Sequence, residues 1–262
     1  MRFNFSLRHC AGFLAVALFA STSNANLILT VGTVTETFTT QPAANNWSTP
    51  AVLFGASSAS ISNDLTADQL VGTPANPITP STNATVTRAL LATQLALGAT
   101  AGTVATANQA LYYTDGFVGT TPTGTDANLL MVSLTNGTTG NLTSLSVRYD
   151  LGSQNVPTTE EIAGHRVYFS LTGNANTWNP IGDFGTVGSV SFNVPIGTLA
   201  AGASAYLLWL DDNAATNPDG LYTIDNVAFT AVPEPSSCLL AFGAIVALGV
   251  KGRRAVRKLL GK

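Results

Sequence analysis

The sequence predicts an all-β fold, an antiparallel β-sandwich that occupies residues 26–231. Threonine and valine, which favour strands, are frequent in this region, and Gly, Asn and Pro interrupt it at short intervals. Several segments alternate apolar and polar residues with a period of two, and no long amphipathic helical pattern is present. The roughly 205 residues are enough for one hydrophobic core, so we expect a single domain.

Four segments carry the strongest strand pattern. Residues 144–149, 166–171 and 189–194 alternate, which predicts strands with one buried face and one exposed face. Their apolar positions, which we expect to face the core, are Leu145, Val147, Tyr149, Val167, Phe169, Leu171, Val190, Phe192 and Val194. In Tyr206–Leu210 the apolar side chains fall on both faces, so this strand is predicted to be covered on both sides.

The remaining strands are predicted from strand-forming residues that lie between turn signals. These candidates are Leu27–Phe38, Ala51–Ile61, Ala84–Leu97, Asn128–Leu134 and Leu221–Thr230. Asn136-Gly137 and Pro218-Asp219-Gly220 are two of the turn signals that separate neighbouring strands. The residues Ala89–Leu97 also suit a helix, and the preceding Thr85-Val86-Thr87 favours the strand.

The N-terminus has the pattern of a secretory signal peptide, residues 1–25. Arg2 and Arg8 form a basic region, Cys10–Ala20 is apolar, and Ser23-Asn24-Ala25 ends in a small residue suited to signal peptidase. A permanent membrane helix is the alternative, but the apolar run of about eleven residues is shorter than the roughly 20 that a spanning helix needs. We therefore expect export, with the secretion machinery and signal peptidase as partners.

The last segment, residues 232–262, has three parts. Pro233-Glu234-Pro235 precedes an apolar run at 236–250, and six Lys and Arg residues follow within 251–262. Because proline cannot lie inside a helix without cost, the tripeptide marks the start of the helix, and the cations hold their side of it in the cytoplasm. The pattern predicts one transmembrane helix at 236–250, whose short length the basic side chains can extend by snorkelling.

This tail resembles the PEP-CTERM sorting signal of Gram-negative bacteria. The resemblance covers residues 232–262 and rests, in this order, on Pro233, Glu234 and Pro235, the apolar helix, and Arg253 and Arg254. It implies recognition by an exosortase-type membrane enzyme, processing near the tripeptide, and a path from an inner-membrane anchor to the cell surface or extracellular polymer. An ordinary single-pass membrane anchor is the alternative.

The charge and cysteine content exclude several classes of function. Residues 26–232 hold three arginines, no lysine and thirteen acidic residues, a net charge of about −10. Such a domain has no basic surface for nucleic acid, and it repels acidic polymers unless a divalent cation bridges them. Cys10 and Cys238 both lie in the terminal apolar segments, so the exported part has no disulfide, cysteine nucleophile or thiolate metal site.

The segments Trp209-Leu210-Asp211-Asp212-Asn213, Asp219-Gly220-Leu221 and Ile224-Asp225-Asn226-Val227 follow one another near the end of the exported part. In this order they resemble the closing strands of jelly-roll domains, among them carbohydrate-binding modules. Along this stretch lie several oxygen-bearing side chains, which include Asp211, Asn213, Asp219 and Asp225. If the predicted strands at Tyr206–Leu210 and Leu221–Thr230 pair, these oxygens can converge on one calcium ion. Calcium takes about six to eight oxygen ligands, and it is the one cofactor that the sequence suggests. The alternative is that these residues cap turns through hydrogen bonds of the Asx type.

Aromatic residues suggest a second kind of site, a platform on which sugar rings stack. Trp178 lies in a loop rich in Gly and Asn, so we expect it to be the most exposed of these rings and a ligand-binding residue. Packing in the core is the alternative for this and the other aromatic residues.

The sequence offers no convincing catalytic set. His165 is the only histidine outside the signal peptide, no Gly-x-Ser-x-Gly motif accompanies it, and we expect it to face solvent at the start of a strand. Glu160 and Glu161 are neighbours in an extended segment and point to opposite faces, so they cannot flank one glycosidic bond. We therefore predict a non-enzymatic exported protein of the cell surface or extracellular matrix. The alternative is a module that binds extracellular polysaccharide.

Overall fold

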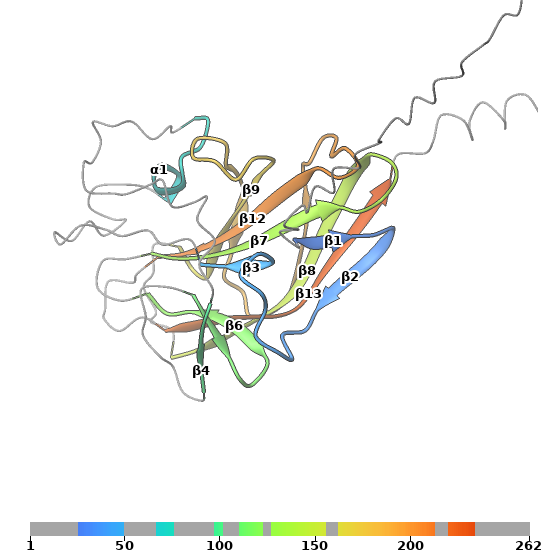
Figure 1. Cartoon of the computed structure of the whole chain (residues 1–262). Coiled ribbons are helices and arrows are strands. Elements are labelled where there is room, and N and C mark those ends of the chain that lie inside the picture. Colours follow the sequence, from blue (N-terminus) through green and yellow to red (C-terminus); the bar gives the residue numbers. More distant parts are fainter. Residues whose placement is uncertain are drawn as a thin grey trace, which may run out of the picture.

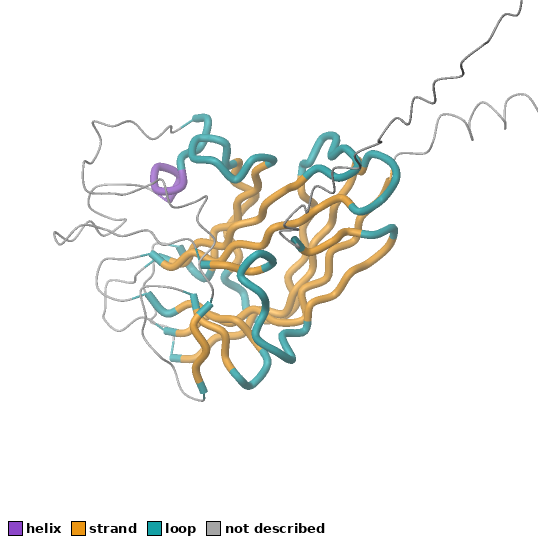
Figure 2. Tube along the Cα trace, viewed as in Figure 1, coloured by secondary structure: helices purple, strands orange, loops and turns teal. Residues whose placement is uncertain are grey.

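Two β-sheets pack face to face in the computed structural model, as Figures 1 and 2 show. The structure describes residues 26–49, 67–75, 97–101, 110–122, 127–155, 162–212 and 220–233. Strands account for nearly all the regular structure in these ranges, where the helical segment is the short α1 (Ala67–Val71). The predicted all-β sandwich is therefore confirmed.

The first sheet contains, within the described ranges, the strands β1-β7-β12-β9-β10 in this order, with β3 paired to β7. The bounds are β1 (Leu27–Leu29), β3 (Trp47–Ser48), β7 (Asn128–Asn136), β9 (His165–Ser170), β10 (Asn179–Phe184) and β12 (Ser204–Asp211). The pairs are antiparallel except for β1 with β7, which is parallel. β7 and β12 lie at the centre of this sheet, and both are buried almost throughout.

The second sheet has the order β11-β8-β13-β6-β5-β4 within the described ranges, and β2 also pairs with β13. The bounds are β2 (Gly32–Glu36), β4 (Gly98–Thr100), β5 (Leu111–Tyr113), β6 (Phe117–Thr120), β8 (Leu142–Gln154), β11 (Gly188–Val194) and β13 (Leu221–Pro233). β13 is the central strand, because β8 pairs with it along its whole length and β6 and β2 share its other edge.

The two ends of the sandwich hold different connections. At one end β13 finishes at Pro233, β7 turns into β8 through residues 137–141, and β9 finishes at Ser170. We name this the tail end, because the chain continues from it into residues 234–262. Figure 1 shows the arrowhead of β13 there, beside β1 and β2. At the opposite end, the far end, β12 finishes at Asp211 and β13 begins.

The alternating patterns of β8 and β11 are confirmed. In β8, Leu145, Val147 and Tyr149 are buried, and the side chains between them are exposed or half-buried. In β11, Val190 and Val194 are buried between exposed polar residues. β12 is buried on both faces over most of its length, as the sequence predicts.

The main core lies between the sheets and is built around aromatic rings. Trp47 of β3 stacks on Trp209 of β12 with ring centroids 5.6 Å apart, and Tyr149 of β8 meets Trp209 edge-on at 6.0 Å. Phe229 of β13 lies 6.4 Å from Trp47. All four side chains are fully buried. Rings from both sheets therefore form one continuous cluster.

A second apolar cluster covers the outer face of the first sheet. It joins α1 to residues of β7, β9 and β12 and to the loop that follows β9. Its buried members are Ala67, Val71, Ala127, Leu129, Met131, Ile162, Tyr168, Trp178, Leu208 and Leu210. This cover explains why both faces of the central strands of the first sheet are buried.

The predicted pattern of β9 is wrong in part for the same reason. Val167 and Phe169 are buried as expected, but Tyr168 and Ser170 on the opposite face are buried too, beneath the second cluster. Leu171, which the alternation places in the core, lies just after the strand and is 45% exposed.

The predicted strand Leu27–Phe38 is divided in two. β1 pairs with β7 in the first sheet, whereas β2 pairs with β13 in the second. Gly32, at the start of β2, has a φ of +97°, a conformation that glycine adopts without the steric cost of a side chain. This residue therefore lets the chain pass from one sheet to the other.

Several predictions fall outside the described residues. These are the strand at Ala51–Ile61, nearly all of Ala84–Leu97, the signal peptide, and the sorting segment after Pro233. No helix in the described ranges has the length and apolar character to span a membrane. The transmembrane helix at 236–250 and the jelly-roll character of the domain stay predictions.

Replacement of Trp209 by alanine tests whether this ring holds the two sheets together. We expect Trp209→Ala to lower the free energy of unfolding by about 3–5 kcal/mol, because it leaves a cavity between Trp47 and Tyr149. Val187→Ala is the control, because Val187 is exposed and such surface changes stay within about 0.5 kcal/mol. Chemical denaturation measures both. Equal losses would contradict the central role of Trp209.

Candidate functional site

The far end of the sandwich holds a row of buried polar side chains. Asp211 of β12 faces Asn128 of β7, and His165 begins β9 one residue before Arg166, the partner of Leu210. His165, Asp211 and Asn128 are all buried. Each lies two residues along its strand from a residue of the main core: Val167, Trp209 and Leu130, respectively. Side chains two residues apart point to the same face of a strand, so the row faces the inside of the sandwich.

His165 links the two sheets. Its Nε2 lies 2.9 Å from the Oγ1 of Thr120 in β6, and its ring meets Tyr222 of β13 edge-on at 5.7 Å. The predicted solvent-facing position is therefore wrong, because the start of β9 is enclosed between the sheets. Burial lowers the pKa of His165 to about 3, so the imidazole is neutral at pH 7.

This geometry gives His165 a structural role. A base with a pKa near 3 is far from the value that favours proton transfer near neutral pH. Thr120, the hydroxyl next to it, is buried as well, so neither group is open to a substrate. Glu160 and Glu161, the carboxylate pair that the sequence analysis set aside, lie outside the described residues.

The predicted calcium set does not assemble as proposed. The prediction requires the strands of Asp211 and Asp225 to pair, but β12 belongs to the first sheet and β13 to the second. Asn213 and Asp219 lie outside the described residues. Within the described ranges, no group of three or more His, Cys, Asp or Glu side chains is placed to hold a metal ion.

Asp225 takes part in turn chemistry, the alternative that the sequence left open. It sits at a β-bulge of β13, where Asn226 has a φ of +51° and the register shifts between Asp225 and Ala228. The backbone N–H of Asn226 donates to Asp225 Oδ1 at 2.6 Å, and the Asn226 amide donates to Asp150 Oδ2 at 2.9 Å. Burial raises the pKa of Asp225, and the Asn226 N–H opposes that shift.

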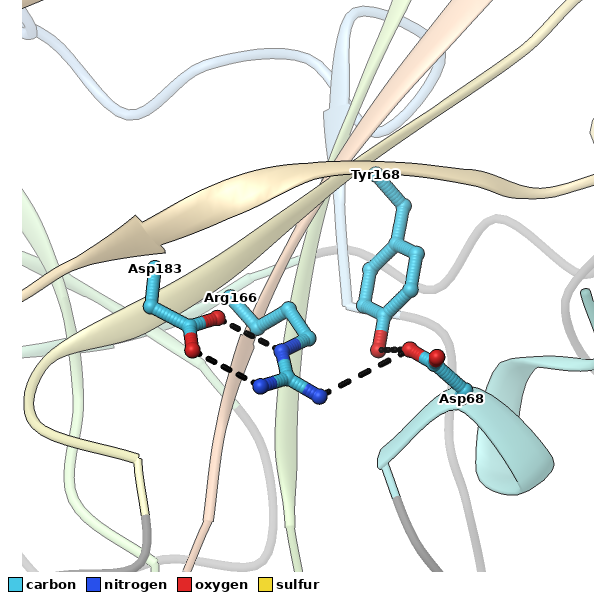
Figure 3. Close-up of polar contacts among 4 residues, drawn as sticks. All are labelled: Asp68, Arg166, Tyr168 and Asp183. Carbon is cyan, nitrogen blue, oxygen red and sulfur yellow. Dashed lines mark hydrogen bonds and ion pairs between the residues drawn. The ribbon is translucent and has the colours of Figure 1, made fainter.

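A cluster of charged groups lies on the outer face of the first sheet, and Figure 3 shows it. The Arg166 guanidinium donates to both carboxylate oxygens of Asp183, at 2.5 Å from Nε and 2.7 Å from Nη2. Its Nη1 lies 3.7 Å from Asp68 Oδ1. The Tyr168 hydroxyl donates to the same Asp68 oxygen at 2.8 Å. One arginine and one tyrosine of β9 therefore bind acids from β10 and α1.

The cluster attaches α1 to the sheet. Arg166 and Asp183 face each other in register across β9 and β10, which places their side chains for a bidentate pair. Its hydrogen bonds with Asp183 raise the pKa of Arg166 above its ordinary value. Burial, and the hydrogen bond with Asp68, raise the pKa of Tyr168. A shallow depression of about 370 Å³ beside the cluster is lined by Asp68, Arg166 and residues 180–183.

The exposed ring predicted at Trp178 is wrong. Trp178 is fully buried in the second apolar cluster, and its backbone N–H lies 3.4 Å from the carbonyl oxygen of Gly72. Ala67 and Val71 of α1 belong to the same cluster and help to cover the Trp178 ring. Among the described residues, every aromatic side chain is buried or half-buried. The described surface therefore offers no open aromatic platform for a sugar ring.

The Arg166 cluster was not predicted from the sequence. Asp183 lies 17 residues after Arg166 on β10, a strand that was not predicted, so the charge pair across this hairpin was missed. Asp68 lies 100 residues before Tyr168, and no periodicity of the sequence joins them. That contact depends on the position of α1 against the sheet.

Comparison with known proteins gives distant likenesses. No protein-family model and no curated protein matches the chain. Among solved structures it is similar to TmCBM61 in complex with β-1,4-galactotriose, at 8% identity and a TM-score of 0.28, over 44% of this chain and 70% of that one. It is also similar to the K1 cleaved adhesin domain of Lys-gingipain from Porphyromonas gingivalis W83, at 14% identity and a TM-score of 0.32, over 76% of this chain and 98% of that one. Both likenesses are distant, and neither assigns a ligand or a binding site to this chain.

Replacement of His165 by glutamine tests its buried, neutral state. The unfolded chain takes up a proton near pH 6.5, whereas the folded chain resists it down to about pH 3. The free energy of unfolding should therefore fall as the pH drops through this window, by up to about 1.4 kcal/mol per pH unit. His165→Gln should make this slope shallower, while the carboxylates contribute alike in both proteins. Denaturation curves between about pH 4 and pH 7 measure the slope, and equal slopes would show that His165 is not buried.

Proposed function

We propose that this protein is an exported, non-enzymatic β-sandwich that a C-terminal sorting segment brings to the cell surface or extracellular polymer. The supporting observation is the direct passage from fold to tail. β13, the central strand of the second sheet, ends at Pro233, which is also the first residue of the Pro-Glu-Pro tripeptide. The sorting segment thus follows the folded domain without an intervening linker.

The charge distribution supports the same topology. Six Lys and Arg residues follow the apolar run at 236–250, whereas residues 26–232 contain three arginines and no lysine. Cations concentrate on the cytoplasmic side of membrane helices, so the sandwich belongs outside the cytoplasm. In this proposal an exosortase-type enzyme meets the tripeptide at the outer side of the inner membrane.

The state of the charged side chains supports a role without catalysis. His165 is buried and neutral, while Arg166 pairs with Asp183 and Asp68. Arg166 belongs to a structural ion-pair network, which shifts pKa values without acid–base work.

Removal of residues 234–262 is the test of sorting. We expect the truncated chain to lose its membrane-bound stage and its final surface location, because it lacks the apolar run. The double variant Glu234→Ala, Pro235→Ala should enter the membrane but stay there unprocessed. Fractionation of the native host with a tagged chain measures both outcomes, and Lys262→Ala is the control. A truncated chain that reaches the same compartment in the same proportion would overturn the proposal.

A second candidate function is the binding of a neutral polysaccharide at the Arg166–Asp183 depression. The observation that favours it is a bidentate, partly exposed pair of polar side chains beside a depression of about 370 Å³. Such a pair can donate and accept hydrogen bonds with sugar hydroxyls. The net charge of about −10 disfavours acidic polymers.

Affinity gel electrophoresis tests this second candidate. Neutral polysaccharides in the gel should retard the native chain, and Asp183→Asn should weaken the retardation severalfold. Asp115→Asn removes an equal charge from an exposed turn and should leave the retardation unchanged. Native protein that no neutral polysaccharide retards would remove this candidate.

A further inference from the structure

We propose that the tail end of the sandwich lies against the lipid bilayer, with its exposed apolar side chains in the headgroup layer. This inference rests on the proposed membrane-anchored stage of the protein, and it adds an interaction surface on the folded domain itself. Three independent observations lead to it: the absence of charge at this end, the position of the exposed apolar residues, and the short distance to the apolar tail.

The tail end carries no charged residue in the described ranges that form it. These ranges are 26–33, 134–144, 170–179, 194–205 and 229–233. The thirteen acidic residues of the exported part all lie elsewhere in the sequence, although that part has a net charge of about −10. Approach to a bilayer would strip water from any carboxylate at the contact, which is costly. An end without carboxylates avoids this cost and keeps the acidic surface at a distance.

The exposed apolar residues gather at the same end. Five large hydrophobic side chains are exposed in the described ranges: Ile28 at 55%, Val31 at 71%, Leu171 at 45%, Val187 at 57% and Val232 at 51%. Four of them lie at the tail end, and Val187 lies in the turn between β10 and β11 at the far end. A hollow of about 410 Å³ at the tail end, which Leu171 helps to line, also has no charged residue in its walls.

The chain length brings this end to the membrane. Val232 is four residues before Ser236, where the apolar run begins. An extended chain advances about 3.5 Å per residue, so these two positions lie at most about 14 Å apart. The headgroup layer on each side of the hydrocarbon core is about 5–8 Å thick. A helix that starts near Ser236 therefore leaves the tail end within or next to the headgroups.

A pair of single-cysteine variants tests the orientation. The exported chain, residues 26–262, carries Cys238→Ser and either Val31→Cys or Val187→Cys, each labelled with a fluorophore. Both positions are exposed valines next to strands, at opposite ends of the sandwich. The labelled chains are placed in phosphatidylethanolamine–phosphatidylglycerol vesicles that contain nitroxide lipids. We expect the nitroxide lipids to quench the label at 31 severalfold more than the label at 187. Ile28→Asp in the first variant should reduce that quenching.

The outcomes separate the docking surface from the anchor. Flotation of the chain with vesicles after a carbonate wash reports the anchor alone. Chains that float while both labels are quenched equally would overturn the docking surface and leave the anchor intact. Chains that do not float would overturn both. Dipolar coupling between spin labels at position 31 of two chains, without lipid quenching, would assign this end to a second copy of the protein and so contradict the lipid contact.

Discussion

The packing of aromatic rings between the two sheets is the interaction on which the rest of the structure depends. The exported part has no cysteine, so no disulfide bond joins the sheets. Trp209 of the first sheet touches Trp47 and meets Tyr149 of the second sheet edge-on. Large rings bury much apolar area each, and they set the distance between the sheets. The position of the polar row depends on that distance too, because the hydrogen bond between His165 and Thr120 joins the first sheet to the second.

The strand pattern could be predicted wherever local alternation decides burial. β8, β11 and β12 follow their sequence pattern because one or both faces meet the core directly. The pattern fails where a segment distant in sequence packs on the outer face of a sheet and buries it. Trp178 looks like an exposed loop residue, but residues 67–75 lie against it. Alternation describes the two faces of a strand and contains no information about what lies above them.

The candidate sites show the same limit. Asp211 and Asp225 are close in sequence and belong to consecutive strands, which suggests a shared site, but consecutive strands of a sandwich can cross from one sheet to the other. Arg166 and Asp183 lie on a hairpin, so their contact follows from register. Asp68 joins them only because the chain folds back over the sheet. A contact within a hairpin can be inferred from sequence only when both strands are predicted, and β10 was not, whereas contacts between layers need the three-dimensional fold.

The central position of β13 has a mechanical consequence. The strand is hydrogen-bonded on both edges and continues directly into the tail. A pull on the tail acts along the strand axis and loads the ladder to β8 in shear, so many hydrogen bonds must break together. A strand at the sheet edge that is peeled from one end loses its bonds one at a time and yields at a lower force. A domain that is tethered through β13 can therefore withstand drag from moving fluid or from a neighbouring cell without unravelling from its attachment point.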